Sequence, residues 1–110
     1  MRLFSVAELL ALPVRMHGIQ LGRPVDVLLD GRGERVVGLE LVCGDGARRF
    51  LPFAVAVLRP DEIAVESALM LLDERDLAYY RARTRSLGDA RLADPRIDEH
   101  GLVHGTRTAA

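Results

Sequence analysis

Few side chains in this sequence have the type and spacing that chemistry requires. His100 and His104 stand four residues apart, which on a helix would place two imidazoles on one face, as in a metal site. Gly101 lies between them, however, and the segment has the pattern of a turn followed by a strand. No further carboxylate or cysteine is spaced to complete a ligand set. We therefore interpret both residues as solvated histidines and expect no metal site.

Cys43 and the pair Asp26 and Asp30 are the other candidates for chemistry. A catalytic thiol needs a nearby base and an electropositive pocket, whereas Cys43 falls on the inward face of a predicted strand. Asp26 and Asp30 share a strand face and could form a carboxylate pair, but the outer face of a strand and a turn at Asp30 explain them. The glycines at 31, 33, 44 and 46 lack the strand-to-helix context of a phosphate loop. We expect no catalytic residues and no cofactor.

One stretch has the composition of a contact surface: Tyr79, Tyr80, Arg81, Arg83 and Arg85. Tyrosine and arginine anchor protein interfaces, and arginines with interleaved aromatic residues also follow nucleic-acid backbones. A third interpretation is a helix that packs its apolar side on the domain and shows its arginines to water. All three interpretations stay open at this point.

Composition limits the class of protein. The 110 residues fit one domain, and a hydrophobic content of 49% supports a packed core. A net charge of −1 provides no global field for nucleic acid or an anionic membrane. The longest apolar run covers residues 50–58, well short of the roughly 20 residues of a membrane helix, so we expect no membrane insertion. A single cysteine and the absence of a signal-peptide pattern favour the cytoplasm.

The hydrophobic pattern predicts a mainly β domain over residues 1–72. Ser5 and Glu8 form a capping box for a short helix. Alternating residues then predict strands at 24–30 (Val25, Val27 and Leu29 inward), 35–43 (Val37, Leu39, Leu41 and Cys43 inward), 48–58, and 62–66 extended to 72. Glycine-containing turns separate them. Five to six short antiparallel strands of this kind would bury one apolar face most economically as a small closed or nearly closed β-barrel.

A C-terminal α-helix and a tail follow the strands. Asp73 is a predicted N-cap, helical spacing continues to Leu87, and Gly88 ends a helix over 73–88. In the tail, 89–110, the run from Leu87-Gly88 resembles that from Leu21-Gly22, and residues 101–105 resemble 33–38. The tail is either a truncated second repeat or a chance similarity. As a repeat, its hairpin would need another chain to cover its edges.

Residues 8–14, 21–30 and 36–39 together resemble the PRC-barrel domain family. The shared pattern is leucine, one residue and Pro-Val, then a turn, Leu-Gly, a strand ending in aspartate, a turn, and a strand containing glycine. That family occurs in the H subunit of the photosynthetic reaction centre and in the C-terminal domain of the ribosome maturation factor RimM. The resemblance covers residues 5–72, and it implies a small barrel that acts in docking or assembly, with no shared catalytic residues to transfer.

These observations predict a non-enzymatic protein–protein interaction or assembly module that forms a homodimer and contacts another protein through the Tyr79–Arg85 stretch. The alternative is an accessory factor for RNA or ribosome assembly, as the resemblance to RimM implies. That role needs a basic face, and the sequence offers only Arg81, Arg83 and Arg85 with Arg48 and Arg49. A small enzyme is the least favoured hypothesis, because no nucleophile, base and orienting group occur together.

Overall fold

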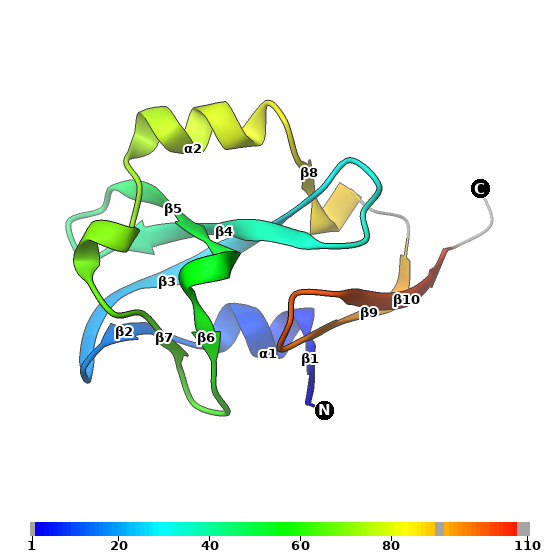
Figure 1. The fold of residues 1–110 in the computed structure, drawn as a ribbon, viewed down its shortest axis with the longest axis horizontal. Coiled ribbons are helices and arrows are strands. Elements are labelled where there is room, and N and C mark those ends of the chain that lie inside the picture. Colours follow the sequence, from blue (N-terminus) through cyan, green and yellow to red (C-terminus); the bar gives the residue numbers. More distant parts are fainter. Residues whose placement is uncertain (1, 90–91, 108–110) are drawn as a thin grey trace.

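The computed structural model describes residues 2–89 and 92–107 (Figure 1). The elements are, in chain order, β1 (Leu3–Ser5), α1 (Val6–Ala11), β2 (Val14–Met16), β3 (Ile19–Leu29), β4 (Val36–Cys43), β5 (Arg48–Pro52), η1 (Phe53–Val55), β6 (Val57–Leu58), β7 (Ile63–Ala64), η2 (Ala68–Met70), α2 (Glu74–Arg81), β8 (Arg85–Ser86), η3 (Leu87–Asp89), β9 (Leu92–Asp98) and β10 (Val103–Arg107), where η marks a 3-10 turn. The prediction of a mainly β chain is confirmed.

The strands form two sheets. The larger has the order β5-β4-β3-β2-β7-β6, with the short β8 added alongside β3, and the smaller has the order β1-β9-β10. All neighbours are antiparallel except β2 and β7, which run parallel. Single bridges, such as Arg35 to Leu102, connect neighbouring segments outside these ladders. Both sheets are open within the described residues, so the predicted closed or nearly closed barrel is not confirmed.

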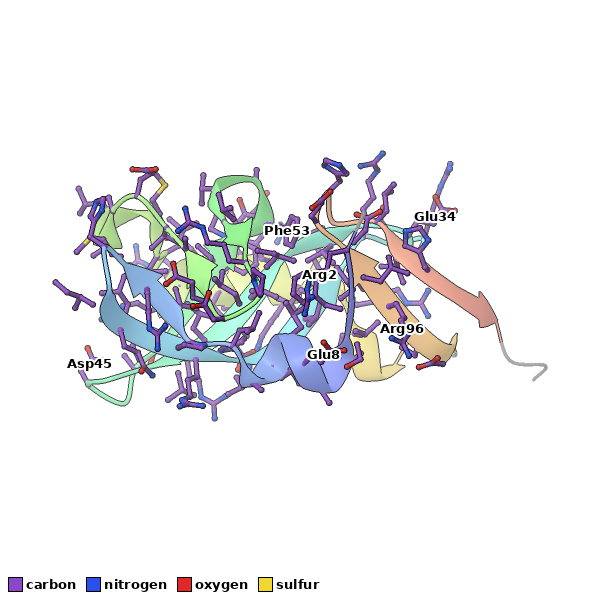
Figure 2. All side chains as sticks on the ribbon, turned by 90° about the horizontal axis from the view of Figure 1, so that it is seen from below. Arg2, Glu8, Glu34, Asp45, Phe53 and Arg96 are labelled. Carbon is purple, nitrogen blue, oxygen red and sulfur yellow. The ribbon has the colours of Figure 1, made fainter. Side chains whose placement is uncertain are left out.

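The N-terminal segment packs against strand β9 near the other end of the chain. Ser5 and Glu8 form the predicted capping box, in which the Glu8 amide donates to Ser5 Oγ at 3.1 Å. Hydrogen bonds from Ser5 lower the pKa of Glu8. Strand β1 pairs with β9, so Ser5 stands opposite Arg96. Figure 2 shows Arg2, Glu8 and Arg96 gathered where these elements meet.

Strand β4 and the C-terminal end of β3 are buried on both faces, which the alternating pattern did not predict. Their pairing skips Val25 of β3 at one bulge and Val37 of β4 at a second, where Leu28 and Leu29 pair with Gly38 and Val36. The first bulge leaves Val25 41% exposed, so its predicted inward position was wrong. The second turns Val36 into the main core and Val37 toward the other face, which reverses the prediction for Val37. Leu39, Leu41 and Cys43 are inward, as predicted.

The main core lies between the larger sheet, α1 and the smaller sheet. Its most enclosed members are apolar side chains from elements far apart in the sequence: Phe4, Leu9, Val14, Val27, Leu29, Leu39, Leu41, Leu51, Ile63 and Ile97. Burial of each such side chain stabilises the fold by roughly 1.5–3 kcal/mol relative to exposure. The tail therefore contributes to the core through Ile97.

The other face of β3, β4 and β5 is covered by α2, on the opposite side of the sheet from α1 (Figure 1). Asp73 caps this helix as predicted, since its side chain accepts from the Asp76 amide. The helix ends at Arg81 rather than at Gly88, because residues 85–86 leave it to form β8 against β3. Among the described residues no helix is long and apolar enough to span a bilayer.

Two predicted strands are interrupted by 3-10 turns. The predicted strand over 48–58 breaks after Pro52, which cannot donate to a ladder, and continues through η1 into β6. The extension of the strand at 62–66 through residues 68–72 was wrong, because Ser67 caps the turn η2 by accepting from the Leu69 amide. Ile63 and Val65 are buried as predicted.

The tail folds onto its own chain. β9 is covered by β1 on one edge and by β10 on the other, and the Val36 amide donates to the Gly101 carbonyl at 2.8 Å. Both edges of β9 are thus covered within the chain, whereas β10 stands at the edge of this sheet among the described residues. Gly101 and Gly33 both have positive φ in hairpin turns, whereas Leu87 starts a 3-10 turn and Leu21 lies in a strand. Residues 90–91 of the proposed repeat lie outside the described residues.

Asp98 holds the turn of this hairpin. Its carboxylate is 1% exposed and accepts hydrogen bonds from the His100 amide (2.8 Å), the Leu102 amide (3.0 Å) and His104 Nε2 (2.9 Å). Burial raises the pKa of Asp98, but the hydrogen bonds from His104 and from the backbone outweigh burial, so the pKa is lowered overall.

Gly38 gives a direct test of how closely the sheet packs under α2. A Cβ at this position would lie 2.5 Å from the Leu51 carbonyl oxygen and would overlap the Phe50 ring. We expect Gly38→Ala to lower the free energy of unfolding by about 1–3 kcal/mol, measured by urea denaturation. Gly44→Ala is the control, because a Cβ there meets nothing within 4 Å. Equal stabilities of the two variants would contradict the packing described.

Asp98 makes stability depend on pH. Because its pKa is lower in the folded chain than the usual 3.8, its contribution is present above that pH and is lost as the pH falls through the folded value. We expect Asp98→Asn to cost about 1–3 kcal/mol at pH 7. The difference from the parent chain should shrink below about pH 3.8 in urea denaturation curves recorded across pH. A difference that is constant down to pH 2 would refute this assignment.

Candidate functional site

A buried carboxylate organises the surface around α2. The Glu40 side chain is 2% exposed and lies on β4, directly under the helix. Arg48 of β5 donates from Nη1 to Glu40 Oε2 at 2.8 Å. Arg81 of α2 donates from Nε at 2.7 Å, and also from Nη2, to Glu40 Oε1. Both carboxylate oxygens are therefore paired, as a buried charge requires.

This arrangement fastens the last turn of α2 to the sheet. Leu77 of the helix is 3% exposed and packs with Phe50 and Leu28. The Tyr80 ring stacks on Phe50, with ring centroids 4.2 Å apart and planes 11° apart. Aromatic pairs of this kind contribute roughly 0.5–1.5 kcal/mol beyond the area they bury. Tyr80, predicted as a contact residue, is thus largely committed to packing.

Tyr79 and Arg83 form the exposed part of the predicted surface. Tyr79 is 53% exposed, and its ring meets Tyr80 edge-on with centroids 5.3 Å apart. The Arg83 guanidinium lies over the Tyr79 ring at 3.7 Å and donates to the Tyr79 carbonyl at 3.0 Å. Each side chain therefore restricts the other while both stay accessible to solvent. We call Tyr79, Tyr80, Arg81, Arg83 and Arg85 the α2 surface.

Arg85 lies next to the helix rather than on it. It belongs to β8, where it pairs with Leu29, and its Nη1 is 3.5 Å from the Gly31 carbonyl. Its neighbour Ser86 donates to Asp26 Oδ1 at 2.8 Å. Asp26 stands opposite Glu40 on the adjacent strand, on the sheet face away from the main core as predicted, and it is part-buried there. The structure brings Arg81 and Arg85 to the two sides of this Asp26–Ser86 pair.

The arginines of the chain are extensively paired. At least seven of its fifteen arginines contact a carboxylate within 4 Å, namely Arg2, Arg15, Arg48, Arg49, Arg59, Arg81 and Arg96. The α2 helix also begins with acidic residues, Glu74 and Asp76 after the Asp73 cap. The positive charge of the α2 surface is consequently confined to the C-terminal end of the helix.

The histidines and the cysteine are placed as follows. His17 lies in a turn with φ of +49°, as predicted, and His100 is exposed beside Glu99. His104 was predicted to be simply solvated, and that was incomplete, because it contacts the buried Asp98. Cys43 is buried with a free thiol. In the described part of the chain, no three His, Cys, Asp or Glu side chains are grouped to hold a metal ion.

Asp45 and Arg49 make a separate ion pair at the β4–β5 turn. Arg49 donates from Nη1 and Nη2 to the two Asp45 oxygens at 3.1 and 3.0 Å. Chiefly through these bonds, the pKa of Asp45 is lowered from 3.8 to about 2. Figure 2 places Asp45 at one end of the molecule and Arg96 near the other. This pair closes its own turn, and it is distant in sequence from the α2 surface.

Sequence reasoning missed Glu40 and Asp98. Both are charged residues in predicted strand or turn segments, where a solvated position is the ordinary expectation. The sequence did carry a signal for Glu40. Gly38 and Phe50 share its sheet face, and a glycine beside a large aromatic residue indicates that another element packs on that face. Asp98 offered the pattern Asp-x-His-Gly, in which an aspartate accepts from backbone amides two and four residues on.

No protein-family model matches the chain, and a search of curated proteins finds no significant match.

Glu40 should control the attachment of α2. We expect Glu40→Gln to leave Arg48 and Arg81 without a counter-charge, to lower the free energy of unfolding by about 1–3 kcal/mol, and to speed amide exchange in α2 more than in β9. Hydrogen exchange followed by NMR measures both effects. Glu66→Gln, at an exposed position, is the matched control and should change neither. Unchanged α2 protection in Glu40→Gln would show that the helix does not depend on this carboxylate.

Proposed function

We propose that the chain is a non-catalytic protein-interaction module of the PRC-barrel type, with the α2 surface as its contact face. The observation that carries the proposal is the exposed pair of Tyr79 on α2 and Arg83 in the turn that follows, next to a last helical turn anchored through Arg81 to buried Glu40. Tyrosine and arginine are the residue types that most often dominate binding energy at interfaces. A surface that is already rigid loses less entropy when a partner binds.

The proposal includes a homodimer. Beyond Val103, whose amide donates to the Glu34 carbonyl, β10 continues to Arg107 at the end of the smaller sheet. An edge strand of this kind offers backbone donors and acceptors to another strand. Antiparallel pairing of β10 with the same strand of a second copy would satisfy both edges by one two-fold axis. The single free cysteine suits the cytoplasm as the location.

RNA binding is the competing function. It gains from the arginines at the end of α2, but a nucleic-acid backbone would also have to pass the acidic first turn of that helix. Phosphate contacts must release counterions, so RNA affinity should fall steeply with salt. Tight, strongly salt-dependent binding of a short RNA by the parent chain would favour this alternative over the interaction module.

Capture from the native cell tests the module directly. The tagged full chain should retain a defined protein, and Tyr79→Ala combined with Arg83→Ala should reduce that protein's recovery at least tenfold, because the exposed pair is lost while the fold is kept. Arg59→Ala, whose side chain contacts Glu62, is the control and should retain the partner. Sedimentation of the purified chain without its partner should give twice the mass of one chain. A monomer whose captured proteins are identical for all variants would overturn the proposal.

A further inference from the structure

A pocket of about 460 Å³ lies beside the α2 surface. It opens between the C-terminal end of α2, strand β8 and the outward face of β3. Its lining is formed by Asp26, Leu28, Arg81, Thr84, Arg85 and Ser86. Pockets that hold small molecules fall in the range of about 300–1,000 Å³.

The two arginines of this pocket are held by the fold. Arg81 directs Nε and Nη2 to Glu40, and a guanidinium has five N–H donors, so donors remain for a ligand. Arg85 is positioned by the β8–β3 pairing, and its 3.5 Å contact with the Gly31 carbonyl is long enough to be given up. Two guanidinium groups from separate elements therefore border one hollow.

The hydroxyl groups of the pocket have already committed their protons. Ser86 Oγ donates to Asp26 Oδ1 at 2.8 Å, and Thr84 Oγ1 donates to the Tyr80 carbonyl at 2.7 Å. Asp26 Oδ1 also accepts from the Val27 amide at 2.8 Å. What the pocket offers to a ligand is thus mainly guanidinium N–H groups. Such a site selects a group that only accepts hydrogen bonds and carries negative charge.

The charge around the pocket decides between a single anion and a polyanion. Asp26 lies inside it, Glu40 lies beneath Arg81, and the first turn of α2 is acidic. A chain of phosphates following the helix would leave the arginines and meet these carboxylates. One planar carboxylate needs only the two guanidinium groups, which match its geometry.

We propose that this pocket binds the carboxylate of an aspartate or glutamate side chain presented by a partner protein. The inference rests on the proposed interaction function and names the chemistry that the partner must carry next to the Tyr79–Arg83 pair. Arg81 and Arg85 donate to the carboxylate, and Leu28 contacts its methylene.

NMR titration of the ¹⁵N-labelled full chain tests the proposal with a defined probe. N-acetyl-aspartate amide should cause saturable shifts of the backbone amides of residues 84–86 and of the Arg81 and Arg85 Nε–H signals. N-acetyl-asparagine amide, the neutral match, should cause none. Arg85→Gln should weaken binding about tenfold, since one charged contact is lost, whereas the control Arg59→Gln should leave it unchanged.

Three outcomes would overturn the proposal. The asparagine probe could shift the same signals, the aspartate probe could shift all arginines equally, or a short RNA could occupy the pocket more tightly than the carboxylate does. The interaction function is judged separately. If partner capture still depends on Tyr79 and Arg83 while the aspartate probe fails, only the carboxylate pocket is lost.

Discussion

The need to neutralise one buried carboxylate governs the arrangement of the α2 side of this molecule. Glu40 sits in the middle of β4 with Leu39 and Leu41 facing the main core, so its own side chain must face the other way. Leaving a carboxylate there without partners would be strongly unfavourable. Arg48 from β5 and Arg81 from α2 supply the charge, and the second of these requires the helix to lie over the sheet.

The packing on this face is consistent with that requirement. Gly38 leaves room for the Phe50 ring, Phe50 receives Tyr80, and Leu77 fills the space beside them. With the inner side of α2 held in this way, its other side carries Tyr79 and Arg83 into solvent at defined positions. The stability of the helix and the display of the proposed contact residues are consequences of the same set of contacts.

Sequence reasoning predicted the parts of the fold that depend on local pattern. The helix caps at Ser5 and Asp73, the glycine turns and the inward positions of Leu39, Leu41 and Cys43 follow from neighbouring residues in the sequence. It did not predict the bulges at Val25 and Val37, because a one-residue shift in pairing depends on the partner strand. The length of the C-terminal helix was overestimated for a related reason, because residues 85–86 gain a strand partner only in the folded chain.

For the candidate site, the sequence indicated the residue types but not their roles. Tyr80 and Arg81 were grouped with Tyr79 and Arg83, yet the first two serve mainly to attach the helix. That division depends on Phe50 and Glu40, which are 30 and 41 residues away from Tyr80 and Arg81 in the chain. Contacts over such separations cannot be recognised from one sequence without a three-dimensional arrangement.

A double-mutant cycle between Glu40 and Arg81 directly tests whether their ion pair holds α2 on the sheet. The free energies of unfolding of the parent chain, Glu40→Gln, Arg81→Gln and the double variant would be measured under one condition. We expect a favourable coupling energy of about 1 kcal/mol or more between Glu40 and Arg81, as residues in one buried ion-pair network show. A coupling energy near zero would contradict the claim that the Glu40–Arg81 ion pair holds α2 on the sheet.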